Sequence, residues 1–247
     1  MANYDYKEGK KRVLEILDNK IEIKKQDDIP DEKYFTFDNG FYGWVTAIFV
    51  DIRDSTTLFS EGDKEKMAKI IRSFTSEIID ILNNDKNKRE IGIRGDCVYA
   101  IYTTPTPADI YELSFKTIYV NTYMKMLNKL LKQKKLPTIS VGIGMATAQE
   151  LVVKAGRKHS GINNQVWIGN AVTKASKLSS IGNKNGLGPI VFSEASYINF
   201  VNEYNKKHSK DIKEHFTEYK YNNEKIYGSG NNLLITDFNT WVENGMK

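Results

Sequence analysis

The run Gly43–Val50 constrains the fold more than any other part of the chain. It reads Gly-Trp-Val-Thr-Ala-Ile-Phe-Val, and its β-branched and aromatic residues are typical of a buried strand. The run is far too short to cross a bilayer as a helix. A polar segment, Asp51–Thr57, follows at once. The strand is therefore predicted to end at a carboxylate, where the chain turns toward a helix.

The composition excludes several classes of protein. Of the 247 residues, 40% are hydrophobic and 27% are charged, which is enough to build a core and excludes a disordered segment. A net charge of +5, spread along the chain, allows a phosphate-bearing ligand without indicating nucleic acid. The single cysteine, Cys97, excludes an internal disulfide and a cysteine-based zinc site. Residues 1–19 are polar and predict no signal peptide, so we expect a cytoplasmic protein without membrane insertion.

Periodicity and composition predict the order of the elements. Helical spacing of apolar residues predicts helices over 7–25, 63–83, 108–134, 170–181 and 194–205. Extended segments are predicted over 43–50, 90–94, 97–102, 138–148, 151–155, 165–168 and 190–193, with a last hairpin over 216–227. The segment 151–155 is expected to be the hairpin partner of 138–148. The resulting β-α-β-β-α-β order indicates an α/β (α+β) ferredoxin-like core with C-terminal additions.

The N-terminal segment is predicted to be distinct from this core. Residues 1–34 would form an amphipathic helix and a linker near Pro30, and residues 35–247 a single domain. We favour half-buried packing of the helix on its own domain. An arm that clasps a second chain is the alternative.

Two carboxylates are expected to meet at one edge of the core. Asp51 ends the first strand, and Asp96 follows Gly95 in the hairpin between the second and third strands. In a β-α-β-β arrangement the first strand lies beside that hairpin. Paired carboxylates suit Mg²⁺ ions that bridge the phosphates of a nucleotide. Helix capping by Asp51 and turn formation by Asp96 are the alternatives.

The segment Ile52–Thr57 adds a possible phosphate site. It leads from a strand end into a helix start, where free backbone N–H groups and the helix dipole attract phosphate. Ser55 and Thr56 add hydroxyl donors. A helix cap without a ligand is the alternative.

Three segments, in the expected order, resemble the class III nucleotidyl cyclases. Phe49–Thr56 resembles the first metal-site strand and phosphate loop of that family, and Arg94–Ala100 resembles the second metal-site hairpin. Val141–Ala146 and Trp167–Leu178 resemble the fourth strand and the dimerisation helix. The resemblance spans residues 43–230.

The resemblance implies a head-to-tail homodimer that binds a nucleoside triphosphate and two Mg²⁺ or Mn²⁺ ions at each interfacial site. The ribose 3′-oxygen would attack the α-phosphorus and release pyrophosphate. The implied sets are Asp51, Ile52 and Asp96 for the metals; Arg53, Asp54, Ser55 and Thr56 for the phosphates; and Asp51, Asp96, Thr173 and Lys177 for catalysis. Thr173 and Lys177 lie one helical turn apart and would come from the other subunit.

The chain departs from the purine cyclases of this family. Gly92 stands where they carry a base-reading Lys or Glu, and Gln165 and Val166 stand where they read adenine. Thr173 and Lys177 replace an Asn and an Arg. These departures resemble the pyrimidine cyclases of the Pycsar anti-phage systems. In those systems, cyclic UMP or cyclic CMP activates a separate effector.

The predicted base-binding residues are Arg94, Gln165 and Val166. Arg94 lies two residues before Asp96, so on an extended strand it points to the same face. A guanidinium only donates hydrogen bonds. It therefore suits the O2 and O4 acceptors of uracil better than the amino group of cytosine, which predicts a preference for UTP over CTP. An ion pair of Arg94 with Asp54 or Glu90 is the alternative.

Three other functions remain open. The chain could be an adenylyl or guanylyl cyclase with atypical base contacts, or an inactive nucleotide-binding module of the same fold. A polymerase palm or an RNA-recognition module shares the β-α-β-β-α-β plan.

Overall fold

The computed structural model describes residues 4–56, 63–158, 161–208 and 211–247. Its strands are β1 (Glu22–Lys25), β2 (Asn39–Ile52), β3 (Lys88–Arg94), β4 (Cys97–Thr103), β5 (Val141–Gly156), β6 (Asn163–Gly169), β7 (Ile190–Ser193), β8 (Phe216–Tyr221) and β9 (Glu224–Ser229). Its helices are α1 (Tyr6–Asp18), α3 (Lys64–Asn83), α4 (Pro107–Gln133), α5 (Ala171–Ile181), α6 (Glu194–Lys207) and α7 (Thr236–Glu243), with 3-10 turns at Glu32–Tyr34 and Lys213–His215.

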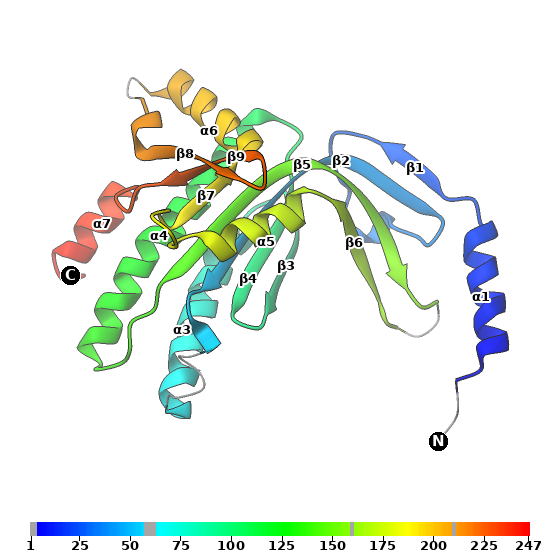
Figure 1. Cartoon of the computed structure of the whole chain (residues 1–247), viewed down its shortest axis with the longest axis horizontal. Helices are drawn as coiled ribbons and strands as arrows, with labels where there is room; N and C mark the ends of the chain where they lie inside the picture. The colour runs from blue at the N-terminus through cyan, green and yellow to red at the C-terminus, as the bar shows by residue number, and fades with distance from the viewer. Residues whose placement is uncertain (1–3, 57–62, 159–160, 209–210) are drawn as a thin grey trace.

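All of the described strands belong to one sheet (Figure 1). Seven of them follow the order β3-β4-β2-β5-β7-β9-β8, while β1 pairs with β2 and β6 pairs with β5. Strand β2 runs antiparallel to both β4 and β5. The succession β2-α3-β3-β4-α4-β5 confirms the predicted β-α-β-β-α-β order, and β7–β9 with α6 and α7 form the C-terminal additions.

Alternation along β2 sends its side chains to two separate cores. Ile48 and Val50 pack under α3, α4 and α6, together with Phe74. Phe49 points to the other face, where Ala175 of α5 packs. Period-two alternation of this kind is what a strand covered on both faces requires.

Helix α5 lies directly against β5 because β5 carries glycine at the contact points. A Cβ atom at Gly142 would lie 2.0 Å from the Ser179 carbonyl oxygen, and one at Gly144 would lie 2.1 Å from that of Ala175. Only glycine permits so close an approach of two backbones. The position of α5 over the sheet is therefore built into the sequence of β5.

Side chains that cap the helix starts explain where two long helices begin. Asp63 accepts hydrogen bonds from the second and third N–H groups of α3. Thr106 and Asp109 form a reciprocal capping box at the start of α4, with Pro107 as its first residue. These side chains satisfy backbone N–H groups that have no partner within the helix, which fixes the first residue of α3 and of α4.

The expected hairpin partner of residues 138–148 was wrong. The segment 151–155 continues the same strand, β5, because β2 is long enough to pair with it from Val153 to Val141. The chain reverses only after Gly156, whose φ of +137° suits glycine. The partner of β5 in this hairpin is β6.

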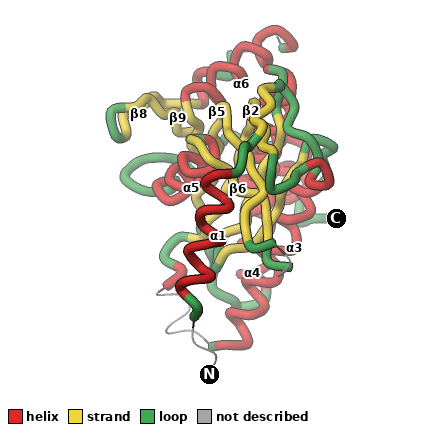
Figure 2. Tube along the Cα trace, turned by 90° about the vertical axis from the view of Figure 1, so that its right-hand side faces the viewer, coloured by secondary structure: helices red, strands yellow, loops and turns green. Residues whose placement is uncertain are grey.

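The N-terminal helix is shorter than expected and is not half-buried. It ends at Asp18, and residues 22–25 form β1. Leu17 is 73% exposed and Ile16 is 62% exposed, so the predicted packing of this helix on its own domain was wrong for the single chain. Figure 1 shows α1 at one end of the molecule, apart from the helices that cover the sheet, and Figure 2 views the molecule from that end, with α1 in front. Ile29, by contrast, is fully buried in the second core, and the division at residue 34 stays a prediction.

Helix α7 was not expected, and it packs against α4. Among the described helices, none combines the length and the apolar character that a bilayer-spanning segment needs.

Candidate active site

The end of β2 brings the predicted metal residues together. Asp51 is the register partner of Cys97 on β4, next to Asp96 in the hairpin turn. Gly95 adopts a φ of +64°, which explains the Gly-Asp sequence of that turn. The predicted proximity of Asp51 and Asp96 is therefore present within one chain.

Arg53 controls the electrostatics around Asp51. Its guanidinium donates a hydrogen bond to Asp51 Oδ2 and another, of 2.5 Å, to the Ser180 carbonyl oxygen in α5. Burial raises the pKa of the Asp51 carboxyl above its ordinary value; the Arg53 guanidinium opposes this, and the Asp96 carboxylate adds to it. The two carboxylates thus repel each other and favour a cation between them.

The donor set fits a divalent metal ion of the hard type. Asp51 Oδ1 and both Asp96 oxygens accept no hydrogen bond from the described residues. The Ile52 side chain is a hydrocarbon without donor atoms, so only its backbone carbonyl oxygen could serve as a ligand. No cluster of three or more His, Cys, Asp and Glu occurs in the described ranges. A metal ion held by Asp51 and Asp96 would therefore need further ligands, such as substrate phosphate or water. Mg²⁺ is commonly bound in this way.

The phosphate segment turns sharply after β2. Asp54 is exposed, with a φ of +54°, and Ser55 and Thr56 have helical backbone. The early N–H groups of a helix lack partners within it, which suits an anion. Arg53, the first residue of the predicted phosphate set, is not available to a phosphate as the other three are. Its side chain is 4% exposed, and its backbone N–H donates to the Ser140 carbonyl oxygen. Its contact with phosphate stays a prediction that requires it to leave Asp51.

Thr57, the last residue of the predicted segment, lies outside the described residues.

The two predicted catalytic residues of α5 face away from the sheet. Thr173 and Lys177 are both exposed. The Thr173 hydroxyl donates to the Gly169 carbonyl oxygen at 3.1 Å. The Lys177 ammonium makes no ion pair with any residue that the structure describes, Asp51 and Asp96 included. One chain therefore holds these residues on the surface rather than in a closed site.

Arg94 lies on the same sheet face as Asp51. Both residues are paired with Cys97 of β4, Asp51 from β2 on one side and Arg94 from β3 on the other, and paired residues point to the same face. Arg94 is exposed and makes no ion pair with Asp54, Glu90 or any other residue in the described part of the chain. The alternative of an internal ion pair is therefore not observed. Its contact with a base stays a prediction.

Glu90 instead connects two parts of the sheet. Its carboxylate accepts hydrogen bonds of 2.6 Å from the Tyr99 hydroxyl and from the Trp167 indole N–H. The Tyr99 ring stacks on Phe49, with centroids 5.1 Å apart, and burial and the hydrogen bond to Glu90 raise its pKa to about 12. A Cβ atom at Gly92 would meet the Tyr99 ring at 2.8 Å. Tyr99 therefore fills the space over the position where purine cyclases carry a base-reading side chain.

Gln165 and Val166 point to opposite faces of β6. Gln165 is 8% exposed, and its Nε2 has no hydrogen-bond partner among the described residues. Val166 is 41% exposed beside Val153. Within one chain the two cannot line the same pocket, and both base contacts stay predictions.

No polar role was predicted for Trp167 or Glu150, and Glu90 was considered only as an ion-pair partner of Arg94. Glu90 lies four residues before Arg94 on one strand, so alternation places both on one face. That spacing was the available signal. Glu150 is fully buried under the start of α5. It was expected in the turn between residues 148 and 151, where a charged residue is ordinary, so no local signal marked it.

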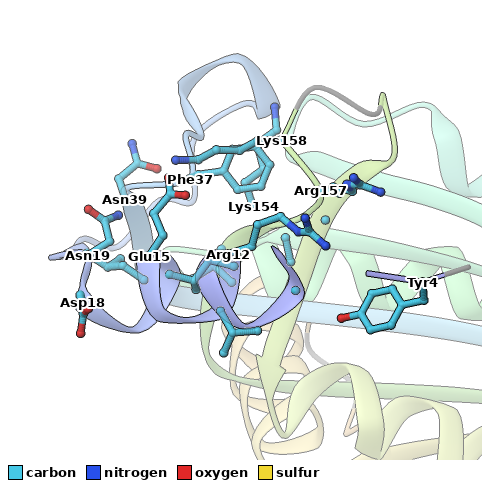
Figure 3. A pocket seen from close by; sticks show the side chains of 17 residues that line it. Tyr4, Arg12, Glu15, Asp18, Asn19, Phe37, Asn39, Lys154, Arg157 and Lys158 are labelled. Carbon is cyan, nitrogen blue, oxygen red and sulfur yellow. The ribbon is translucent and has the colours of Figure 1, made fainter. Parts of the chain in front are cut away.

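A cavity of about 1280 Å³ lies elsewhere, between α1 and the end of β5 (Figure 3). Arg12, Lys154 and Lys158 are among its lining residues, and Lys158 lies over the Phe37 ring. None of the residues predicted for the active site lines this cavity.

Comparisons with known proteins show which family the chain resembles. Residues 38–215 match the family described as the adenylate and guanylate cyclase catalytic domain. The chain is 52% identical over 246 residues to a uridylate cyclase of Treponema porcinum, covering 100% of this chain and 83% of that protein. It is 30% identical over 253 residues to a uridylate cyclase of Gulbenkiania mobilis, covering 98% of this chain and 96% of that one.

A solved structure has the same fold. The adenylyl cyclase CyaB from P. aeruginosa superposes with a TM-score of 0.61 at 20% identity, covering 77% of this chain and 95% of that chain. The mixed α/β architecture is thus that of the cyclases.

Proposed function

This chain belongs to the adenylate and guanylate cyclase catalytic domain family, the class III nucleotidyl cyclases, and on that premise we propose that it converts UTP to 3′,5′-cyclic UMP and pyrophosphate. That it is a nucleotide cyclase follows from the family. The choice of UTP is carried by the 52% identity, over the whole chain, to a protein named uridylate cyclase. Arg94, exposed on the face of Asp51, supports the same choice because its donors match the acceptors of uracil.

The proposed mechanism is phosphoryl transfer by positioning and charge stabilisation. Asp51, Asp96 and the Ile52 carbonyl would hold divalent ions, which class III cyclases generally use and which supply charge neutralisation at the phosphates. Asp54, Ser55 and Thr56 would orient the triphosphate. The ribose 3′-oxygen forms a bond to the α-phosphorus, the bond from that phosphorus to the pyrophosphate oxygen breaks, and the 3′-hydroxyl proton passes to solvent. Lys177 would neutralise the transferring phosphoryl group as a point charge.

A head-to-tail homodimer completes this proposal. Support comes from Thr173 and Lys177, which lie on the surface of one chain and make no contact with its own carboxylates. The exposed apolar residues of α1 favour the arm alternative for residues 1–34 over packing on the same chain. Sedimentation of the full chain and of a variant that lacks residues 1–18 tests both points. We expect a dimer for the full chain and weaker association for the variant.

The biological role proposed is the synthesis of a second messenger in anti-phage defence. Cyclic UMP would activate a separate effector, as in the Pycsar systems that the sequence resembles. Cells that carry the chain with its genomic neighbours are expected to resist phage. The Asp51→Asn variant is expected to abolish that resistance.

The direct test uses purified protein with each of the four nucleoside triphosphates and Mn²⁺ or Mg²⁺. Mass spectrometry of the products is expected to find cyclic UMP as the main species. A cyclic purine nucleotide as the main product would establish an adenylyl or guanylyl cyclase with atypical base contacts. Binding of a nucleotide without any cyclic product would indicate an inactive module.

A further inference from the structure

Glu150 is a buried carboxylate that the proposed mechanism does not use. It lies on β5 beneath the start of α5, and its exposed fraction is 0%. Its Oε1 accepts a hydrogen bond from the Ala171 N–H, and the Val172 N–H also interacts with the carboxylate. Asn170, at the N-cap position, makes no capping hydrogen bond with its side chain. Glu150 therefore caps α5 from a different element of the fold.

The surroundings of Glu150 leave it little freedom. A Cβ atom at Gly169 would lie 2.7 Å from the carboxyl carbon of Glu150. Its Oε2 is buried and has no partner among the described residues. Burial raises the pKa of this carboxyl, and the backbone N–H groups of Ala171 and Val172 oppose that rise. A group kept in this position despite its desolvation cost points to a role beyond packing.

Glu150 is the last of three attachment points of α5 along β5. Gly142 lies under Ser179, Gly144 lies under Ala175, and Glu150 holds Ala171. The helix contacts occur every four residues, so they share one side of α5. The two glycine contacts are close packing, which sets a distance. The hydrogen bond to Ala171 is directional and fixes the first turn.

The positions of Thr173 and Lys177, the two residues of α5 predicted to be catalytic, depend on the orientation of that first turn. Thr173 and Lys177 each follow an attachment residue by two positions, which places them about 200° around the helix. They therefore point away from β5, consistent with their exposure. A tilt of the first turn would displace Thr173 directly and Lys177 one turn later.

We propose that Glu150 is a positioning residue, whose carboxylate fixes the first turn of α5 and so places Thr173 and Lys177 for the cyclisation reaction. It is not a catalytic residue, because it is buried and holds only backbone groups. The proposal rests on the proposed function, since it assigns a task to the helix that would carry the catalytic contacts.

Two substitutions of similar volume separate the hydrogen-bond acceptor from the packing. Glu150→Met removes both oxygens and leaves the Ala171 N–H unpaired, whereas Glu150→Gln keeps one carbonyl oxygen for it. We expect kcat with UTP to fall about 10- to 100-fold in the Met variant while KM changes less than about threefold, because misplacing a catalytic group affects mainly the chemical step. The Gln variant is expected to restore kcat to within about threefold of the wild type.

The matched control is Thr106→Ala, which removes the cap of α4, a helix without predicted site residues. It is expected to lower Tm by about 2–4 °C, the scale of one lost cap in a chain of this size, and to leave kcat unchanged. The proposal is overturned if the Met variant keeps wild-type kcat, if Gln and Met lose kcat equally, or if Thr106→Ala loses it as well. Should the Met variant not fold, Glu150→Asp replaces it, because the shortened carboxylate retracts from Ala171 and is expected to lower kcat in the same way.

Hydrogen exchange gives a readout that does not depend on activity. The Ala171 and Val172 amides are expected to exchange faster in the Met variant than in the wild type or the Gln variant. Absence of cyclisation by the wild type would refute the proposed function alone. Unchanged exchange in the Met variant would refute the role of Glu150, whatever the activity.

Discussion

Asp51 and Asp96 are the residues on which the proposed chemistry depends most. Asp51→Asn or Asp96→Asn is expected to lower cyclase activity by more than about 100-fold, because each removes a negative ligand from a dication that stabilises the transition state. Product formation from UTP with Mn²⁺ measures the effect, and chelation of the metal by EDTA should match it. Asp80→Asn, an exposed carboxylate on α3, is the control and should retain full activity. A double Asp51/Asp96 variant with substantial turnover would contradict the assignment.

Arg94 is the residue expected to distinguish uracil from cytosine. Arg94→Ala should reduce the preference for UTP over CTP by about 10-fold or more, because a donor that faces the cytosine amino group leaves both unpaired at a cost of about 1–3 kcal/mol. Competition between the two triphosphates, with wild type and variant, measures the ratio. A wild type that prefers CTP or ATP, or a variant that keeps its full preference for UTP, would exclude Arg94 as the base reader.

Glu150 makes stability depend on pH with a defined sign. Its pKa is raised in the folded state, so as pH rises above the ordinary value of 4.5 the unfolded chain releases this proton first. The free energy of unfolding contributed by Glu150 therefore falls as pH rises, by about 1.4 kcal/mol for each unit of the pKa difference. Glu150→Gln should gain stability relative to the wild type between pH 4.5 and 7.5. Urea denaturation across that range tests the sign.

At the scale of elements, the strands and turns that are determined by their own residues could be predicted from the sequence. The strand that ends at Asp51 and the hairpin at Gly95 were predicted because an apolar run and a turn dipeptide are local signals. The continuation of β5 through residues 149–150 was missed, since the pairing with β2 that extends it is a long-range contact. The Glu90–Trp167 hydrogen bond was missed for the same reason, as 77 residues separate the pair.

The packing of α5 on β5 gives the prediction at this scale. Gly144→Ala should lower the free energy of unfolding by about 1–3 kcal/mol and reduce cyclase activity, because the new Cβ would push against the α5 backbone. Chemical denaturation and UTP turnover measure the two effects. Gly230→Ala is the matched control, since the nearest atom to its new Cβ is 3.9 Å away. Equal stability of the two variants would show that α5 can shift without cost.

At the scale of the whole molecule, one chain carries both halves of the predicted site without joining them. Asp51 and Asp96 lie together at the end of β2, whereas Lys177 lies on the surface without contact to either. No pattern within a single sequence states which surface of one copy meets which surface of another. The proximity of Asp51 and Asp96 could thus be predicted from strand order, whereas the head-to-tail dimer was predicted only from the resemblance to a family and stays a prediction.

Mixing two inactive variants tests that assembly. Asp51→Asn and Lys177→Ala should each be inactive alone, and their mixture should regain activity, because one of the two sites in a heterodimer would receive both intact residues. The expected recovery is about a quarter of wild-type activity at full exchange, since half of the random dimers are mixed and each has one working site. No recovery, with subunit exchange demonstrated by mass spectrometry, would place all catalytic groups in one chain.

The close approach of α5 to β5 also limits how a chain of this kind can evolve. Any mutation at codon 142 or 144 that adds a side chain would place its Cβ about 2 Å from a backbone oxygen. Only glycine is therefore expected to be tolerated at these two positions. The opposite side of the same helix can accept substitutions, because Thr173 and Lys177 on that side are exposed. Substitutions in α5 can therefore accumulate on its outward face while its position over the sheet stays constant. If Thr173 and Lys177 act as proposed, selection could change the residues that contact the substrate while the scaffold stays the same.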